Sequence, residues 1–278
     1  MINGHTQLFG IVGRPVTHSM SPAMHNAAFS ELGINGVYVP MQPDSLEQGF
    51  YGLRSLGFSG VSVTVPFKVD IMAFLDHIDP VAQKIGAVNT LLFDRNNPDQ
   101  VISKGYNTDW LGANQALAEE VTLADSTVLV IGAGGAARAV GFGLLEAGAQ
   151  VIIANRTASK GQELAAQLGC PFVAATDIAT IQADALINTT SVGMHPHIDG
   201  LPIAAELLDH FAVVMDIVYA PLQTRLLREA ALRGCRTIDG LQMLLHQGAA
   251  QFSLWTGQSA PHATMRQALL RELQARAI

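Results

Sequence analysis

The sequence predicts an α/β protein built from two successive α/β units. Apolar runs alternate with segments of helical length in residues 8–66 and again in residues 127–219, and this alternation is typical of βαβ units. A glycine-rich segment follows the first apolar run of the second series, as it does in dinucleotide-binding folds. The chain has 278 residues, of which 49% are hydrophobic and 14% charged, so it can bury a large core.

The first unit is predicted from five segments in the order strand, helix, strand, helix, strand. They are 8–13, 21–34, 36–41, 45–57 and 60–66. The second unit is predicted from six segments that begin with a strand and end with two strands. They are 127–132, 136–148, 150–156, 159–169, 185–190 and 213–219.

Two helical regions flank the second unit. Residues 107–121 have a helical spacing of apolar side chains, so this segment is expected to carry the chain from the first unit to the second, with the boundary near Gly105. The final 30 or so residues are rich in Ala, Leu, Gln and Arg and contain no strand pattern. They are predicted to be helical.

Charge and cysteine content exclude several classes of function. The net charge is −7 and no cluster of Lys or Arg interrupts it, so we expect no nucleic-acid partner. The sequence contains no leader-like amino terminus and no long uncharged apolar run, which predicts a cytoplasmic protein without a membrane contact. Cys170 and Cys235 lack the number and spacing of a disulfide framework or a zinc site.

Gly132, Gly134 and Gly135 lie between a predicted strand and a predicted helix. Glycines at this point permit a tight turn and a close approach of the backbone to a pyrophosphate, whose charge is stabilised by the amides at the helix start. The strand that follows is also present, so the whole segment predicts a dinucleotide site rather than a structural turn.

The residues after the second strand of this unit favour NADP over NAD. An NAD site commonly has Asp or Glu here, to accept from the ribose hydroxyls, whereas this chain has Asn155. Arg156 and Lys160 supply positive charge, and Thr157 a hydroxyl, for a 2′-phosphate. The alternative is that Arg156 is a solvated residue at the end of a strand.

Lys68 is a candidate for proton transfer. Hydride transfer to a carbonyl requires a proton donor, and Lys68 follows an apolar predicted strand and Pro66, in the region where open α/β sheets bind ligands. Asp109, at a predicted helix start, could pair with it. The alternatives are a solvated lysine and an acidic residue that caps its helix.

Ser19 and Ser21 precede a predicted helix that Pro22 opens. Their hydroxyls, together with backbone amides, could bind a substrate carboxylate. Serine before proline is also common at the start of a helix, so capping is the alternative role.

Nine segments, taken in order, resemble the motifs of the shikimate dehydrogenase family. They are GRPVTHSMSPAMHN, VTVPFK, GAVNT, GYNTD, GAGGAAR, NRT, NTTSVGM, DIVYAPLQT and DGLQMLLHQ. The resemblance extends over almost the whole chain. It implies an N-terminal α/β substrate domain of residues 1–105, completed by the C-terminal helices 241–278, and a Rossmann-type NADP-binding domain of residues 106–240, with a cleft between them.

The resemblance also implies an activity. Members of the family reduce 3-dehydroshikimate to shikimate reversibly with NADPH, a step in aromatic amino-acid biosynthesis. The expected ligands are therefore NADP and a shikimate-like cyclic hydroxy acid. The expected assembly is a monomer or a homodimer.

By the same resemblance, Lys68 is the acid/base residue and Asp109 its partner. The implied substrate contacts are Ser19, Ser21, Thr64, Asn89, Tyr219 and Gln247. The implied pyrophosphate contacts are Gly132, Ala133, Gly134, Gly135 and Ala136, and those of the 2′-phosphate are Asn155, Arg156, Thr157 and Lys160. Met194, Ile217 and Gly240 are placed at the nicotinamide end.

Three positions depart from the family pattern. Ser62 occupies the position where members commonly have Asn, Trp110 the position where Gly is frequent, and Leu241-Gln242 precedes Met243. A paralogue that acts on quinate or aminoshikimate, with NADP or NAD, is therefore an alternative. A ligand sensor without catalysis is a second alternative, but such a protein would not need both Lys68 and Asp109.

Overall fold

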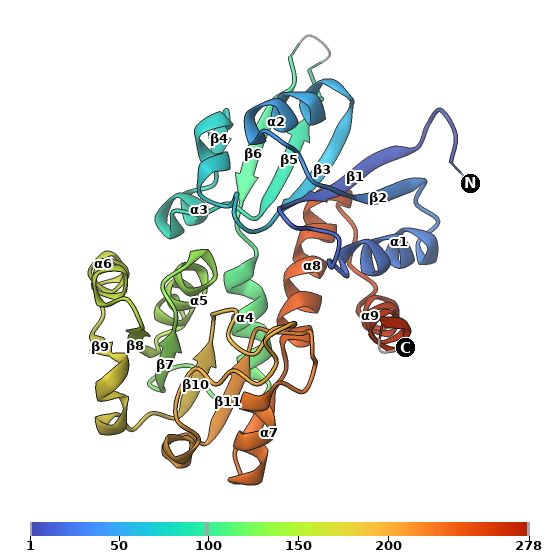
Figure 1. The fold of residues 1–278 in the computed structure, drawn as a ribbon. Coiled ribbons are helices and arrows are strands. Elements are labelled where there is room, and N and C mark those ends of the chain that lie inside the picture. The colour runs from blue at the N-terminus through green and yellow to red at the C-terminus, as the bar shows by residue number, and fades with distance from the viewer. Residues whose placement is uncertain (1, 98–99, 277–278) are drawn as a thin grey trace. The chain divides into compact units, whose positions relative to one another are not determined.

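The computed structural model describes residues 2–97 and 100–276, which form α-helices and two β-sheets (Figure 1). The chain divides into two compact units, Met1–Thr108 with Gln247–Ile278, and Asp109–His246. The first boundary lies after Thr108 because the side chain of Asn107 donates to the Ala87 carbonyl and the Thr108 N–H donates to Asn89 Oδ1. Through these hydrogen bonds, Asn107 and Thr108 pack as part of the first unit.

The sheet of the first unit has the strand order β2-β1-β3-β5-β6-β4. Strands β1 (Gln7–Val12), β2 (Gly36–Met41) and β3 (Phe58–Val63) are parallel. Strand β5 (Thr90–Asp94) pairs antiparallel with both β3 and β6 (Ile102–Tyr106), and the short β4 (His77–Ile78) runs parallel to β6.

The β5–β6 pair extends the parallel sheet that the sequence pattern predicts. Its two strands flank the segment Asn96-Asn97-Pro98-Asp99, and turn residues between two apolar runs are a hairpin pattern. Strand β3 ends at Val63, so Thr64 to Lys68 form a turn rather than a continued strand.

Four short helices complete the N-terminal part of this unit. They are α1 (Ser21–Glu31), α2 (Leu46–Ser55), the 3₁₀ helix η1 (Asp70–Phe74) and α3 (Pro80–Ile85). The Ser45 side chain accepts from the Gln48 N–H and the Asp79 side chain from the Val81 N–H, so each caps its helix. Helix α1 packs against α9 (His262–Arg276).

The core of the first unit combines residues from both ends of the chain. Phe9 and Phe29 have ring centroids 4.9 Å apart, and Phe29 lies 5.5 Å from Phe252. His25 stacks on Tyr38 at 4.5 Å and is fully buried. The C-terminal residues are therefore part of this core, in which a contiguous aromatic cluster excludes water.

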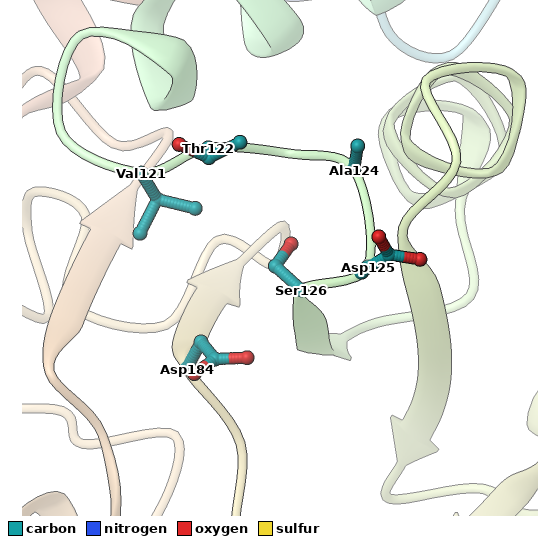
Figure 2. A pocket seen from close by; sticks show the side chains of 6 residues that line it. All are labelled: Val121, Thr122, Ala124, Asp125, Ser126 and Asp184. Atoms are coloured by element: carbon teal, nitrogen blue, oxygen red, sulfur yellow. The ribbon is translucent and has the colours of Figure 1, made fainter.

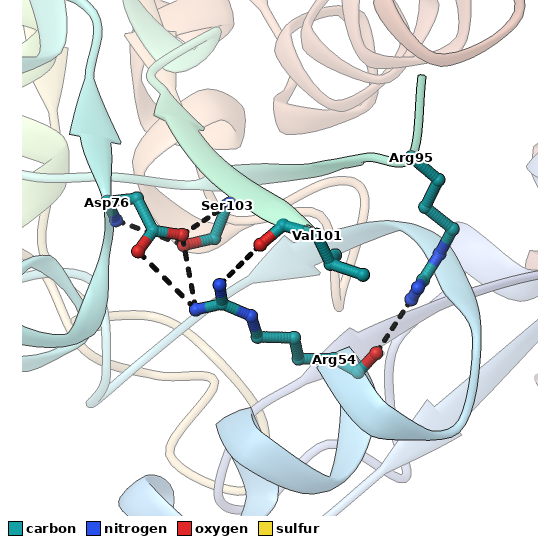
Figure 3. A network of polar contacts seen from close by, with 5 residues as sticks. All are labelled: Arg54, Asp76, Arg95, Val101 and Ser103. Atoms are coloured by element: carbon teal, nitrogen blue, oxygen red, sulfur yellow. Dashed lines mark hydrogen bonds and ion pairs between the residues drawn. The ribbon is translucent and has the colours of Figure 1, made fainter. Parts of the chain in front are cut away.

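A polar network ties helix α2 to strands β4 and β6 (Figure 3). The Arg54 guanidinium lies 3.1 Å from the Asp76 carboxylate and also donates to the Val101 carbonyl. The same carboxylate accepts from the N–H and hydroxyl of Ser103 at 2.7 and 2.8 Å. Burial opposes the charge of Asp76, but the bonds from Ser103 and Arg54 hold its pKa below the usual value.

The second unit contains a six-stranded parallel sheet of order β12-β11-β10-β7-β8-β9. Its strands are β7 (Thr127–Ile131), β8 (Gln150–Asn155), β9 (Phe172–Ala174), β10 (Ala185–Asn188), β11 (Val213–Asp216) and β12 (Arg236–Ile238). The order reverses between β7 and β10, as in Rossmann-type sheets. This confirms the predicted fold class.

The helices of the second unit are α4 (Asp109–Ala118), α5 (Gly135–Glu146), α6 (Ala158–Leu168), η2 (Ala175–Thr180), η3 (Ala205–His210) and α7 (Arg225–Leu232). Trp110 of α4 makes an edge contact with Phe142 of α5, with centroids 6.1 Å apart. The bulk of Trp110 therefore serves the packing of these two helices. Helix α8 (Gly240–Thr256) continues through the second boundary, between His246 and Gln247.

None of the helices in the described part of the chain combines the length and apolar composition needed to cross a bilayer. Within residues 2–97 and 100–276, no group of three or more His, Cys, Asp or Glu is arranged to hold a metal ion.

Candidate active site

The predicted pyrophosphate turn lies at the carboxyl end of β7. Gly132 follows the strand with φ of 129°, a conformation that side chains rarely adopt. A Cβ added here would lie 2.4 Å from the Thr189 hydroxyl. Gly134 precedes α5 and has open space around its added Cβ, and Gly135 is the first residue of the helix. Together with Ala133 and Ala136, they form the turn between β7 and α5, and their contact with a pyrophosphate remains a prediction.

The predicted 2′-phosphate residues lie beside this turn. The Gly132 N–H donates to the Ala154 carbonyl at 2.8 Å, which brings the end of β8 next to the end of β7. Asn155 ends β8 and its amide donates to the Thr157 carbonyl at 2.8 Å. Arg156 and Lys160 are exposed. Neither forms an ion pair or a side-chain hydrogen bond within the described residues, so both cations are available to an anionic ligand.

The residues predicted for the nicotinamide end share the same edge of the sheet. The Ile217 N–H, just after β11, donates to the Asn188 carbonyl at the end of β10. Gly240 follows β12, and an added Cβ there would lie 2.4 Å from the Ile217 carbonyl oxygen. The loop of Met194 is joined to that of Tyr219 by a bond from the His195 N–H to the Ala220 carbonyl at 2.9 Å. Met194 is 39% exposed.

Asp216, which the sequence analysis did not single out, organises these loops. Its buried carboxylate accepts from the Asn188 amide at 3.0 Å, the Val218 N–H at 3.0 Å and the Thr224 hydroxyl at 2.7 Å. Burial raises the pKa of Asp216 to about 6, and the three donors oppose that rise. The position of Asp216 at the end of a strand could have indicated it as a site residue, because the carboxyl ends of parallel strands line the ligand-binding edge of such a sheet.

A second site region lies in the first unit, around the end of β3. The Thr64 N–H donates to the Val12 carbonyl at 2.9 Å, and the Phe67 N–H closes a turn onto the Thr64 carbonyl at 3.0 Å. The carbonyl of Lys68 accepts from the Val88 N–H at 2.8 Å, and its side chain is half-buried. The Arg14 N–H also donates to the Val65 carbonyl at 3.0 Å, so three backbone bonds fix the segment from Thr64 to Lys68 against neighbouring parts of the chain.

Asn89, one of the predicted substrate residues, makes hydrogen bonds through both atoms of its amide group. It is buried, and its Oδ1 accepts from the Thr108 N–H at 2.8 Å and from the Thr90 hydroxyl at 2.6 Å. Its Nδ2 donates to the Thr108 hydroxyl at 3.0 Å and to Gln247 Oε1 at 3.4 Å. The structure thus brings together Asn89 and Gln247, which lie far apart in the sequence.

Ser19 and Ser21 lie at the start of α1. The backbone N–H of Ser21 donates to the Ser19 hydroxyl at 3.3 Å, whereas Met20 occupies the cap position without a side-chain cap. Arg276 donates to the carbonyls of His18 and Ser19, the latter at 3.1 Å. Ser19 therefore takes part in local turn bonding, and the carboxylate role of both serines remains a prediction.

Asp109 and Tyr219 belong to the second unit, whereas Lys68 belongs to the first. Asp109 is the first residue of α4 and is buried. Its pairing with Lys68, and the part of Tyr219 in substrate binding, remain predictions.

A surface pocket of the second unit lies away from this edge. Its lining residues are Val121, Thr122, Ala124, Asp125, Ser126 and Asp184 (Figure 2). Ser126 precedes β7 and Asp184 precedes β10, so the pocket is at the amino ends of the strands. Ligands of parallel α/β sheets bind at the carboxyl ends, and the two carboxylates here would repel phosphates.

Family models match three consecutive parts of the chain. Residues 11–91 match the shikimate dehydrogenase substrate binding domain, residues 114–199 the shikimate / quinate 5-dehydrogenase model, and residues 240–270 the shikimate 5′-dehydrogenase C-terminal domain. These parts contain most of the residues described above.

A shikimate dehydrogenase (NADP(+)) of Methanosarcina mazei is 45% identical over 283 residues, covering 97% of this chain and 99% of the relative. A crystal structure of a shikimate dehydrogenase with NADP+ has a TM-score of 0.91 at 41% identity and covers 98% of each chain. A shikimate 5-dehydrogenase of Thermus thermophilus, solved with NADP(H) and shikimate, has a TM-score of 0.88 at 40% identity, covering 96% of this chain and all of the other. With both units matched, the chain belongs to the shikimate dehydrogenase family.

Proposed function

We propose that this protein is an NADP-dependent shikimate dehydrogenase, which interconverts 3-dehydroshikimate and shikimate. The observation that carries the cofactor assignment is the glycine turn after β7. Beside it, at the same edge of the sheet, lie the side chains of Arg156 and Lys160, which form no ion pair within the described residues. The names of the relatives and the match to the substrate-binding model support the substrate.

The second unit fits NADP at three points. The start of α5 has no side-chain cap, and Gly134 leaves open space in front of the helix, where amides and the helix dipole stabilise a pyrophosphate. Arg156 and Lys160 would neutralise a 2′-phosphate, and no carboxylate occupies the end of β8 to repel it. Ile217, Gly240 and Met194 would surround the nicotinamide end.

NADPH, when bound, supplies the hydride that reduces the carbonyl carbon. In that direction, the Lys68 ammonium donates a proton to the carbonyl oxygen as the oxygen gains negative charge. In the oxidation of shikimate, the neutral Lys68 amine accepts the hydroxyl proton. Asp109 is proposed to pair with Lys68 and to orient its ammonium group.

The first unit would bind the substrate around Lys68. We propose that Ser19 and Ser21 hold the carboxylate, while Thr64, Asn89, Tyr219 and Gln247 contact the ring hydroxyls. The amides of Asn89 and Gln247 are linked to each other, so they would act as one surface toward the substrate. The enzyme would serve aromatic amino-acid biosynthesis in the cytoplasm, as a monomer or homodimer.

Steady-state kinetics with shikimate and quinate, each with NADP+ and NAD+, test this function. We expect shikimate with NADP+ to give the highest kcat/KM of the four pairs. A higher kcat/KM for quinate would instead identify a quinate dehydrogenase, and the absence of turnover with either acid would contradict an enzyme of this class.

A further inference from the structure

A chain of buried hydrogen bonds runs through the first unit and ends on Asn89. The Tyr38 hydroxyl donates to Ser62 Oγ at 2.7 Å, and Ser62 Oγ donates to Gln251 Oε1 at 2.7 Å. Gln251 Nε2 donates to the Thr90 hydroxyl at 2.9 Å, and that hydroxyl donates to Asn89 Oδ1 at 2.6 Å. All five side chains are at most 4% exposed.

Two backbone groups determine the direction of every bond in this chain. The Asn89 carbonyl can only accept, so the Gln251 atom 3.1 Å from it is Nε2. Gln251 Oε1 therefore faces Ser62, and Ser62 must donate to it. The Ser62 oxygen is then the acceptor for Tyr38.

The same reasoning fixes the amide of Asn89. The Thr108 N–H can only donate, so the Asn89 atom that faces it at 2.8 Å is Oδ1. The Thr90 hydroxyl oxygen accepts from Gln251, so its hydrogen is donated to Asn89 Oδ1. The Asn89 Nδ2 group therefore donates, to the Thr108 hydroxyl at 3.0 Å and to Gln247 Oε1 at 3.4 Å.

Helix α8 supplies both glutamines of this arrangement. Gln247 and Gln251 are four residues apart and therefore lie on one face of the helix. Gln251 is 1% exposed and Gln247 8% exposed. The more buried glutamine, Gln251, bonds to the Asn89 carbonyl. A substrate oxygen that approaches the Asn89 amide would compete with Gln247 Oε1 for an N–H donor whose direction is fixed.

We propose that Ser62 and Gln251 are positioning residues for substrate binding, because their bonded pair holds the Thr90 hydroxyl and the Asn89 carbonyl and so, together with Thr108, fixes the position of the Asn89 amide. This role rests on the proposed function, in which Asn89 contacts a substrate hydroxyl. It also gives Ser62, at a position where the family commonly has Asn, a function without direct contact to substrate. Both bonds of its hydroxyl are directed to Tyr38 and Gln251.

Two variants interrupt the chain at different bonds. Ser62→Ala removes the donor to Gln251, and Gln251→Glu removes the donors to Thr90 and the Asn89 carbonyl at neutral pH. We expect each to raise the KM for shikimate at least tenfold, with kcat within threefold of the parent and the KM for NADP+ unchanged. Loss of an interaction present in both ground and transition states has this signature.

Trp255→Phe is the matched control. The Trp255 indole N–H donates to the Leu91 carbonyl at 2.9 Å, which is another bond from α8 to β5 that does not involve Asn89. This variant is expected to lose stability but to keep the KM for shikimate within twofold. Equal increases in KM for Trp255→Phe and Ser62→Ala would mean that any loosening of α8 suffices, and would overturn the proposal.

A pH series separates positioning from simple destabilisation. The carboxyl group introduced by Gln251→Glu can again donate one hydrogen bond once it is protonated. The KM ratio of this variant to the parent should therefore fall as the pH is lowered from 8 to 5.5, whereas that of Ser62→Ala should stay constant. In the parent, the two titratable groups of this cluster remain neutral over this range, because burial lowers the pKa of His25 to about 3 and raises that of Tyr38. His25 lies against Gln251, so the double variant His25→Phe with Gln251→Glu is measured as well, to show that the pH response comes from the carboxyl group and not from His25. A constant ratio for Gln251→Glu would contradict the proposal.

A readout without turnover keeps this proposal distinct from the proposed function. In the parent and in Trp255→Phe, the Asn89 side-chain amide protons should exchange with solvent slowly, as measured by NMR of asparagine labelled with ¹⁵N. In Ser62→Ala and Gln251→Glu, they should exchange at least tenfold faster. Unchanged exchange would refute the positioning role, whereas a parent enzyme that does not oxidise shikimate would refute only the proposed function.

Discussion

Lys68 lies in the turn between β3 and η1, where its carbonyl accepts a bond from Val88 beside Asn89. The segment from Thr64 to Lys68 is therefore held by backbone bonds that do not depend on the lysine side chain. Removal of the ammonium should leave these backbone bonds of the turn in place.

Lys68→Ala is expected to lower kcat by roughly 100-fold or more, the lower end for loss of a general acid/base, with a smaller change in KM. Turnover of the variant and parent, under conditions in which chemistry limits the rate, checks this. Lys84→Ala, on the exposed last turn of α3, is the control and should behave as the parent. An unchanged kcat for Lys68→Ala would remove this residue from the mechanism.

Arg156 is the residue expected to bind the 2′-phosphate of NADP. Arg156→Ala should raise the KM for NADP+ roughly 10- to 100-fold, because a hydrogen bond to a charged group contributes about 1.5–3 kcal/mol. The KM for NAD+ should stay within about twofold. The comparison uses both cofactors with shikimate in excess.

Arg236→Ala is a suitable control for this experiment. Arg236 is an arginine of the same unit that pairs with Glu120 at 3.2 Å, at the start of β12. Losses of equal size for NADP+ and NAD+ in Arg156→Ala would show that the guanidinium does not contact the phosphate.

At the scale of an element, the β7–α5 turn contains glycines with two different physical roles. Gly132 has φ of 129° and no room for a Cβ beside Thr189, whereas Gly134 has φ of −91° and open space around it. The first glycine is required by the fold of the turn. The second is required only if a ligand occupies the open space.

Gly132→Ala and Gly134→Ala should therefore separate folding from binding. We expect Gly132→Ala to lower the free energy of unfolding by about 1–3 kcal/mol through backbone strain, as measured by urea denaturation. Gly134→Ala should unfold like the parent yet bind NADP+ at least tenfold more weakly, measured by calorimetry. Normal NADP+ affinity in Gly134→Ala would place the pyrophosphate elsewhere.

At the scale of the whole molecule, one buried titratable group in each unit is expected to make the two units respond to acid in opposite directions. In the first unit His25 is fully buried, and this burial lowers its pKa from 6.5 to about 3 although the adjacent Gln251 side chain opposes the shift. Between these values only the unfolded chain binds the proton, so the stability of this unit falls as the pH drops below 6.5.

In the second unit, burial raises the pKa of Asp216 from 3.8 to about 6. Between these values the folded chain binds the proton and the unfolded chain does not, so the stability contributed by this group rises as the pH drops below 6. From pH 7 to pH 5, the two shifts correspond to a loss of about 2 kcal/mol for the first unit and a gain of about 1 kcal/mol for the second.

Urea unfolding of the full chain at pH 7 and pH 5 tests this prediction. The two tryptophans report on separate units, since Trp255 lies in the first and Trp110 in the second, and each can be followed alone after substitution of the other by Phe. His25→Phe should remove the acid sensitivity of the Trp255 signal, and Asp216→Asn should remove the gain at Trp110. The same pH response in the parent and in both variants would contradict the assignment to these two groups.

Sequence patterns predicted the parallel strands, the glycine turn and the cations after β8, because each depends on neighbours within a few residues. The periodicity of apolar residues and the conformational demands of glycine are local properties. For the same reason, the segments 127–132 and 150–156 correspond closely to β7 and β8.

The antiparallel pair β5 and β6, the bond between Asn89 and Gln247, and the buried chain through Ser62 and Gln251 were decided only by the tertiary structure. Gln251 contacts residues about 160 positions away in the chain, and no local pattern encodes such a pairing. Once packing brings these groups together and excludes water, each buried donor must find an acceptor. That requirement fixes the orientation of the amides, which the sequence by itself left undetermined.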